Sequence, residues 1–483
     1  MTAVAVFMSF LDVTIVNIAF PNLRVEFATT PLPLLSWVIN GYGVVFAAAL
    51  IPAGRLADRI GRRRLFLAGI VVFLVASAGC GLAPTPAVLI AARVVQALGA
   101  AAVVPTSLAL LLPEFPLAQR ATATSIWGAT GAVAAATGPA LGGALVAWAD
   151  WRLVFFVNVP IGLAALIPAR RLLTESRDPQ SAPAADWWGA LLLAVGVAGL
   201  ALAIVQGPGW GWVDPRTVGS FAAGALLLGV FVRRCARHRA PIVDLGLFRV
   251  RSFAVANAGT VVFAVGFYGL LLCNVLFLTG VWGFAIGLAG AALTPGAVTA
   301  ALLAPFGGRA ADRFGQRTVA VPGGLLFAAG TAFLAVSSNR TPGYLTNFLP
   351  GVLLTGAGIG LSISSFGSAA VAELPRARFA TGSAITACFR QLGAVLGIAV
   401  LLAIIGNPTA TSALATFHNA WWVMAATGVV AAACGVALGR ITARDSDATD
   451  IRASATEANA TGPDNAGAPV AAIGTTSIDR TAT

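Results

Sequence analysis

Long apolar stretches separated by short polar segments recur from the start of the chain to about residue 438. A helix that crosses the bilayer core, which is roughly 30 Å thick, needs about 20 mostly apolar residues. Lipid cannot satisfy backbone N–H and C=O groups, so each stretch is predicted to be a helix. We count fourteen such stretches, at residues 4–20, 34–53, 65–82, 87–112, 121–147, 153–167, 188–205, 218–232, 253–276, 284–305, 319–336, 346–366, 384–405 and 421–438. The pattern predicts an all-α integral membrane protein.

The composition narrows the class further. Of the 483 residues, 58% are hydrophobic and 10% are charged, whereas soluble domains carry about 25% charged residues. A soluble enzyme, a nucleic-acid-binding module and a disordered regulator are therefore disfavoured. The five cysteines have neither paired nor metal-ligand spacing, so no disulfide and no metal are expected. All 30 basic residues are arginine, which together with the abundant Ala and Gly indicates a G+C-rich genome.

The arginines are distributed unevenly between the two sides of the predicted membrane. With the N-terminus inside, the cytoplasmic segments hold 22 arginines and the opposite loops hold 4. Positively charged loops stay in the cytoplasm, so both termini are expected to be cytoplasmic and the number of spans even. The alternative is that the clustered arginines of the cytoplasmic segments bind anionic lipid.

A ten-residue sequence occurs twice in the chain. Residues 54–63 match residues 308–317 at seven of ten positions. The first copy follows the second span and the other copy follows the tenth, which predicts two six-helix units separated by two extra helices. Parallel repeats of this kind characterise one transporter architecture. The expected domains are a six-helix bundle at 1–170, two additional helices at 171–240, a second six-helix bundle at 241–440 and a disordered cytoplasmic tail at 441–483.

Six segments stand out as signature-like, at residues 11–21, 54–64, 93–101, 138–143, 151–162 and 390–397. They resemble signature sequences of the major facilitator superfamily, specifically its fourteen-span drug/proton antiporter group. The resemblance extends over nearly the whole chain up to about residue 438, with two departures. Ala134 stands where the family often has Gly, and the tenth and thirteenth spans lack the acids that some members have and that are linked to divalent cationic drugs.

The resemblance implies a monomeric secondary transporter of the bacterial inner membrane, with the major-facilitator fold and 14 transmembrane helices arranged 6+2+6. It would export hydrophobic or monocationic drugs and toxic compounds by alternating access, driven by the proton gradient, with no cofactor and no catalysis. The expected partners are the substrate, protons and membrane lipid, and not nucleic acid. A dedicated exporter of one metabolite, lipid or antibiotic is the alternative; a membrane-embedded enzyme and a channel are less favoured.

Asp12 is the only acid placed near the middle of a predicted span. A lone buried carboxylate is costly, so Asp12 is the candidate proton carrier, protonated in one facing state and deprotonated in the other. Arg93, in the segment that resembles the proton-coupling motif, is expected to set the protonation of Asp12 directly or through Gln96 and water. The alternatives are an Asp12 that stays paired permanently and an Arg93 that only clamps helices together.

Further polar residues lie in apolar runs, where they either line a substrate cavity or bond helices to one another. Asn17 and Asn40 are the foremost cavity candidates because they lie on the first two spans. Arg390 could instead extend toward the lipid headgroups. The remaining cavity candidates are Gln96, Asn257, Asn274 and Gln391.

Two motifs are expected to serve the transport cycle without contacting substrate. The repeated loop would be a cytoplasmic gate that joins the two halves in one state and releases them in the other. Its two glycines, Gly54 and Gly61, are expected in the tight turn. The fifth-span motif, Gly138, Pro139, Gly142 and Gly143, is expected to bend the helix and let it pack closely, and the family links it to export. The other gate residues are Asp58, Arg59, Arg62 and Arg63, with Asp312 and Arg313 in the second copy.

Overall fold

The computed structural model describes residues 1–116, 120–177, 185–375, 378–406 and 411–439. For residues 120–126, 128, 129, 132, 312 and 380 it describes the backbone alone. The predicted tail, residues 441–483, therefore lies outside the described residues.

The regular structure of the described residues is helical throughout, as the apolar pattern predicts. Thirteen helices in this part of the chain are long and apolar enough to cross a membrane. The 29-residue helix α6 supplies the remaining predicted span. The long helices are α1 (Thr2–Glu26), α3 (Trp37–Ile60), α4 (Arg62–Gly81), α5 (Pro86–Leu111), α6 (Arg120–Trp148), α8 (Asn158–Leu172), α9 (Trp187–Trp210), α10 (Pro215–Arg237), α11 (Arg251–Gly280), α12 (Ile286–Phe314), α13 (Arg317–Ser337), α14 (Leu349–Ala372), α15 (Phe379–Ile405) and α16 (Ala413–Leu438).

Short helical pieces precede four of these helices. They are α2 (Leu32–Leu35) before α3, α7 (Leu153–Phe156) before α8, the 3₁₀ turn η3 (Leu245–Arg249) before α11 and the π-helical turn η4 (Tyr344–Phe348) before α14. A count of apolar residues does not reveal the interruption between α7 and α8, because the hydropathy continues across it.

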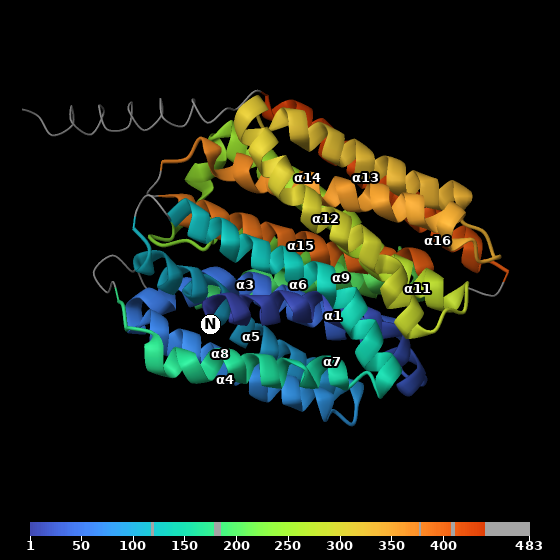
Figure 1. Ribbon diagram of the computed structural model, residues 1–483, viewed down its shortest axis with the longest axis horizontal. Coiled ribbons are helices and arrows are strands. Elements are labelled where there is room, and N and C mark those ends of the chain that lie inside the picture. The colour runs from blue at the N-terminus through green and yellow to red at the C-terminus, as the bar shows by residue number, and fades with distance from the viewer. Residues whose placement is uncertain (117–119, 178–184, 376–377, 407–410, 440–483) are drawn as a thin grey trace, which may run out of the picture.

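The helices form two bundles that lie side by side, as Figure 1 shows. In the first bundle α5 packs against α3 and α4, and α6 and α8 pack against α1. In the second, α13 packs against α14 and α16, and α11 packs against α15 and α16. Contacts between the bundles are made by α6 with α12, α3 with α15, and α1 with α11.

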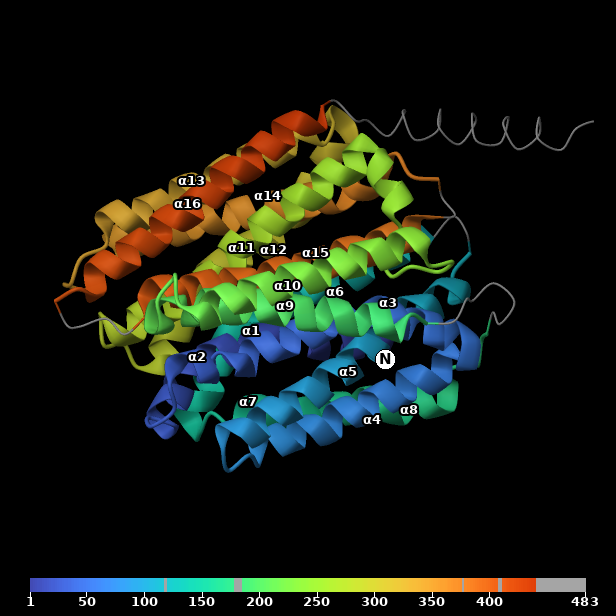
Figure 2. The ribbon, with the colours of Figure 1, turned by 180° about the vertical axis from the view of Figure 1, so that it is seen from behind.

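The two additional helices lie across the junction of the bundles (Figure 2). Helix α9 contacts both α3 and α15, whereas α10 packs chiefly on α9. At their ends, the buried carboxylate of Asp186 accepts hydrogen bonds from the Gly189 backbone N–H, at 2.8 Å, and from Arg234 Nε, at 2.9 Å. The hairpin is therefore closed by a charged pair at the point where α9 begins and α10 ends.

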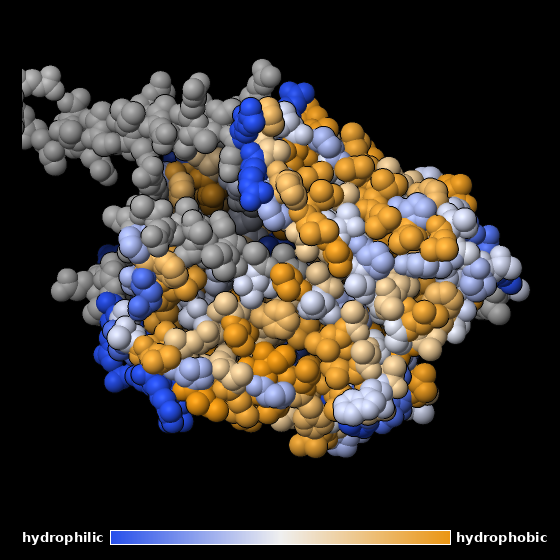
Figure 3. All heavy atoms as spheres, in the orientation of Figure 1, coloured by the Kyte–Doolittle hydropathy of each residue, from blue (hydrophilic) through white to orange (hydrophobic). Residues whose placement is uncertain are grey.

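The outer surface is consistent with a protein embedded in lipid. In Figure 3 hydrophobic residues cover the sides of the molecule, and hydrophilic residues gather toward its two ends. Large apolar side chains such as Val75, Leu226 and Leu302 are at least 60% exposed. In water this much exposed apolar surface would be unfavourable, and in a bilayer it faces acyl chains.

Candidate functional site

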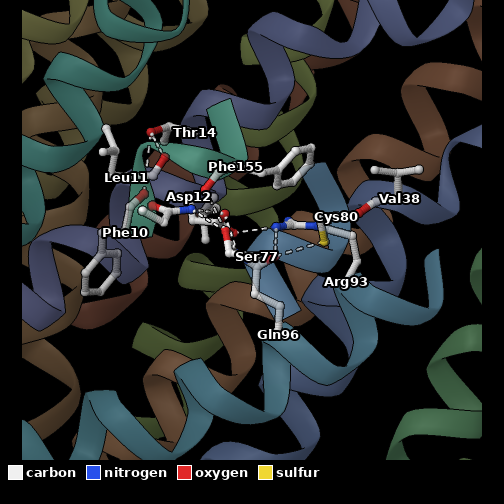
Figure 4. Close-up of polar contacts among 12 residues, drawn as sticks. Phe10, Leu11, Asp12, Thr14, Val38, Ser77, Cys80, Arg93, Gln96 and Phe155 are labelled. Carbon is white, nitrogen blue, oxygen red and sulfur yellow. Dashed lines mark hydrogen bonds and ion pairs between the residues drawn. The ribbon is translucent and has the colours of Figure 1, made fainter. Parts of the chain in front are cut away.

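Asp12 lies near the middle of α1 and is completely buried, with 0% exposure. Its carboxylate faces Arg93 of α5, which is 1% exposed. Arg93 Nη1 donates to Asp12 Oδ2 at 2.5 Å (Figure 4). The two residues expected to form the proton-coupling site are thus in direct contact, and each neutralises the charge of the other.

Arg93 is fixed by two further contacts on α3. Its Nε donates to the backbone carbonyl of Val38 at 3.0 Å. Its guanidinium lies over the ring of Tyr42, 4.1 Å from the ring centroid, an arrangement that favours a cation electrostatically. Helix α3 also contacts α15 of the other bundle. A movement of Arg93 would therefore shift α3 at the junction between the bundles.

Two amide side chains complete the coordination of Asp12, and both also donate to the Ser77 hydroxyl (Figure 4). Gln96 accepts from Arg93 Nη1 at 2.7 Å and donates from Nε2 to Asp12 Oδ1 at 2.9 Å. Asn158, at the start of α8, donates to the same oxygen at 3.0 Å and to Ser77 Oγ at 3.1 Å. The Ser77 hydroxyl donates to the Phe155 carbonyl at 2.8 Å. Asp12 thus accepts three hydrogen bonds, from Arg93, Gln96 and Asn158.

Ser77 and Asn158 are the two residues of this cluster that the sequence did not single out. Both are 0% exposed. Asn158 has a detectable signal, because it is an amide within an otherwise apolar stretch. Ser77 has none, because a lone serine is common in membrane helices, where it also serves close packing.

A small cavity of about 20 Å³ adjoins the cluster on the side of Arg93. Its volume suffices for about one water molecule. Asn17, Asn40, Tyr42 and Gln391 are among its lining residues, and Asp12 is not. The structure therefore brings three of the predicted cavity residues together at one place, between α1, α3 and α15.

Several polar atoms around this cavity lack a partner among the described residues. They are Asn17 Oδ1, both side-chain polar atoms of Asn40, and the Tyr42 hydroxyl. A buried polar group without a hydrogen bond costs about 1–3 kcal/mol. Because these unpaired polar atoms surround one cavity, they indicate that a molecule bound there, either water or substrate, forms hydrogen bonds with them.

Asn257 and Asn274 lie elsewhere. Asn274 accepts a hydrogen bond from the Trp421 indole at 2.9 Å and so joins α11 to α16. Asn257 donates to the Phe253 carbonyl of its own helix at 2.8 Å. Neither lines the cavity beside Arg93. The contacts of Asn257 and Asn274 therefore favour a structural role, in hydrogen bonds within and between helices, over a role in the substrate cavity.

Arg390 does not extend toward the end of its helix. Its guanidinium lies 6.0 Å from the centroid of the Phe10 ring, on α1 of the other bundle. The following residue, Gln391, lines the cavity, with its Oε1 3.5 Å from the Tyr268 hydroxyl. Arg390 itself is not among the residues that line this cavity. Its contact with Phe10 places it at the junction between the bundles, which favours a role there over an interaction with lipid headgroups.

The gate motif is ordered by contacts within the first bundle and with the segment after α10. Asp58 accepts from Arg62 Nε at 2.8 Å, within its own motif. Arg55 donates to the carbonyls of Ala240 and Pro241, both at 2.6 Å. Arg63 donates to the Arg170 carbonyl at 2.7 Å. The state seen here thus has Asp58 paired locally rather than across the bundles.

The two glycines of the motif differ in role, and the expectation for Gly54 was wrong. Gly61 lies in the turn with φ +122°, and a side chain there would meet the Glu175 carboxylate. That carboxylate accepts from the backbone N–H groups of Arg63 and Arg64, at 3.0 and 3.2 Å, and so caps α4. Gly54 is inside α3, where it faces Pro105 of α5. Gly54 therefore lies within a helix and not in a turn.

The second copy of the motif is less fully described. The Asp312 side chain lies outside the described residues, and Arg313 lies over Phe314 at 5.2 Å. Gln316, which replaces the arginine of the first copy, accepts from Ser368 Oγ on α14 at 2.9 Å.

The fifth-span motif lies on α6, which continues through Pro139. Gly138 and Gly142 face α1: an added Cβ would lie 2.1 Å from Thr14 Oγ1 and 2.7 Å from Ile15 Cγ1, respectively. Gly143 faces α12, where its Cβ would lie 2.9 Å from the Ile286 carbonyl. Only glycine allows such approaches, so the motif joins α6 to both bundles at the end where α6 terminates and α12 begins.

A buried ion pair beside a small cavity between two helical bundles is the organisation of a membrane transporter rather than a soluble binding protein. Comparison with known proteins agrees. The family profile described as Major Facilitator Superfamily matches residues 2–295. The peptide transporter POT, in a crystal structure with sulfate, superimposes with a TM-score of 0.64 at 18% identity, covering 91% of this chain and 95% of that one. The chain belongs to the Major Facilitator Superfamily.

Several relatives are named as resistance and export proteins. The multidrug resistance protein Stp of Mycobacterium tuberculosis is 37% identical over 403 residues, which are 83% of this chain and 74% of the relative. The tetracenomycin C resistance and export protein of Streptomyces glaucescens is 33% identical, with the same shares of each chain. The methylenomycin A resistance protein of Streptomyces coelicolor is 33% identical over 82% of both chains. The predicted superfamily is confirmed.

Proposed function

We propose that this protein exports small hydrophobic or monocationic compounds across the bacterial cytoplasmic membrane in exchange for protons. The observation that carries the proposal is the Asp12–Arg93 pair, buried beside a cavity between the bundles. The names of the relatives support resistance and export as the physiological role. The same names are equally compatible with the alternative, a dedicated exporter of one antibiotic or metabolite.

The coupling follows from charge. With Asp12 deprotonated the pair is neutral, so a monocation can enter the cavity. Protonation of Asp12 removes its negative charge and leaves the guanidinium of Arg93, which lines that cavity. The cavity then carries an uncompensated positive charge in a medium of low dielectric constant, which disfavours a monocation. Proton and cation thus exclude one another, as exchange requires.

The exchange would proceed by alternating access of two bundles around the central site. Here α6 and α12 are in close contact at the end that contains Gly143 and Gly287. With the expected cytoplasmic termini, this is the outer end. The state seen here is then closed to the outside, with a cavity too small for a drug-sized compound.

The test is ethidium efflux from pump-deficient bacteria that produce the wild-type protein or Asp12→Asn at equal membrane abundance. We expect the wild type to lower intracellular dye in a way that a protonophore abolishes, and Asp12→Asn to be inactive. Glu114→Gln, which alters an exposed carboxylate, is the matched control and should export normally. Protonophore-sensitive export by Asp12→Asn would refute the assignment of Asp12, and absence of ethidium efflux from every variant would favour the dedicated exporter.

A further inference from the structure

Among the described residues, the Arg390 guanidinium has no charged partner, although it lies at membrane depth. Arg390 is the twelfth residue of α15, so it lies about 16 Å along the axis from the first residue at about 1.5 Å per residue. Its side chain is partly buried and points across the junction to Phe10, two residues before Asp12. Among the described residues it makes neither a hydrogen bond nor an ion pair.

The carboxylate nearest in sequence to Phe10 cannot serve as the missing partner. Asp12 is 0% exposed, and its two oxygens accept from Arg93, Gln96 and Asn158. Arg378, the residue directly before α15, illustrates the contrast: it is exposed and pairs with Asp244 at 3.0 Å. Arg390 is therefore the cation of α15 whose charge the described protein leaves uncompensated.

The surroundings of Arg390 are apolar and aromatic. Phe10 faces the guanidinium, and the following turns of α15 bring Ala394, Val395 and Ile398 to the cavity wall. An unpaired cation in such surroundings is costly. A guanidinium binds carboxylates and other oxyanions through paired hydrogen bonds and also stacks on aromatic rings.

From these observations we infer that Arg390 binds the acidic group of hydrophobic substrates, so that the transported range includes aromatic carboxylates, sulfonates and phenolates. The inference rests on the proposed export function and extends its substrate class. The acid group would pair with Arg390, and the apolar body would lie against Phe10 and the α15 wall. Unlike the charge of the Asp12 site, that of Arg390 is constant, so it selects the substrate and does not carry the proton. An acid group paired with Arg390 forms a neutral pair, so the exclusion by charge described for a monocation does not apply to it.

The experiment compares two aromatic dyes of opposite charge in proteoliposomes with an imposed pH gradient: the monoanion 1-anilinonaphthalene-8-sulfonate and the monocation ethidium. We expect the wild type to transport both. Arg390→Gln should lower transport of the sulfonate at least tenfold without lowering that of ethidium, and Arg390→Lys should retain most sulfonate transport. Arg378→Gln, which removes the paired arginine directly before α15, is the matched control and should transport both dyes normally.

The outcomes separate the inference from the proposed function. Sulfonate transport that is unchanged in Arg390→Gln, or absent from a wild type that transports ethidium, overturns the inference alone. If the wild type moves neither dye, the proposed function fails, and the inference is still decided by binding. In that case, binding of the sulfonate to the detergent-solubilised wild type and to Arg390→Gln is measured by its fluorescence. Equal affinities for the two proteins contradict the role of Arg390.

Discussion

Asp12 and Arg93 are each tolerable at membrane depth only because the other is present. Removal of one partner of a buried ion pair leaves an uncompensated charge and costs about 3–5 kcal/mol, whereas removal of both can be nearly neutral. Arg93 also loses contacts to Val38 and Tyr42 when it is replaced. Stability and coupling should therefore respond differently to single and double substitutions.

We predict that Arg93→Gln lowers the thermal stability of the detergent-solubilised protein markedly, and that Asp12→Asn/Arg93→Gln recovers most of the loss. Neither variant should perform proton-driven export, because the double variant has no group to carry the proton. Thermal unfolding followed by tryptophan fluorescence, together with ethidium efflux, checks both statements. A double variant as unstable as the single one, or one that still exports, would contradict the coupled pair.

At the residue scale, the sequence was sufficient to identify the site residues that are charged or amide groups within apolar runs. Asp12, Arg93 and Gln96 are charged or amide groups in apolar runs, and the structure brings them into contact. Which amides share the site depends on the rotation of each helix against its neighbours. Asn274 and Asn40 are both amides within apolar runs, yet the first bonds to Trp421 and the second lines the cavity.

At the scale of elements, α6 and α12 approach so closely that side chains are excluded from their interface. A Cβ on Gly290 would lie 2.4 Å from the Pro139 carbonyl oxygen, and one on Gly143 would lie 3.1 Å from the Gly290 Cα. Neither neighbour is a flexible side chain that could move away. A substitution there must separate the two helices.

We predict that Gly290→Val greatly reduces export and favours the state in which α6 and α12 are apart, with the folded protein still produced. Gly229→Val on α10 is the matched control, because nothing lies within 4 Å of its added Cβ, and it should export normally. Ethidium efflux at matched membrane abundance measures the effect. Normal export by Gly290→Val would show that this contact is dispensable for the cycle.

The positions of the helices were predictable because length and hydropathy determine which segments can cross a bilayer. Their interruptions were not, since the break between α7 and α8 falls within an apolar run. That break matters for the site: it places the Phe155 carbonyl beside Ser77 and puts Asn158 at the first turn of α8, facing Asp12. The contact of α9 with both bundles could not be predicted from hydropathy either. Hydropathy indicates that a helix lies in the membrane, but not which helices it packs against.

For the molecule as a whole, alternating access requires the end closed by α6 and α12 to open once in each cycle. Ala147 and Gly287 lie across this contact, and a Cβ built on Gly287 is 3.1 Å from that of Ala147. Disulfides span Cβ–Cβ distances of about 3.5–4.5 Å, so a shift of a few tenths of an ångström allows Ala147→Cys/Gly287→Cys to form one. Of the native cysteines, Cys80, Cys235, Cys273 and Cys388 are buried and will compete little.

Oxidation of this double variant should stop export by holding the bundles in the state seen here, and a reductant should restore it. Each single cysteine variant should be insensitive to the oxidant. Proton-driven uptake of ethidium into everted membrane vesicles measures the effect, with the disulfide quantified by the fraction of free thiol. Full transport by cross-linked protein would mean that α6 and α12 stay together throughout the cycle, and the opening of this end would have to be assigned to other helices.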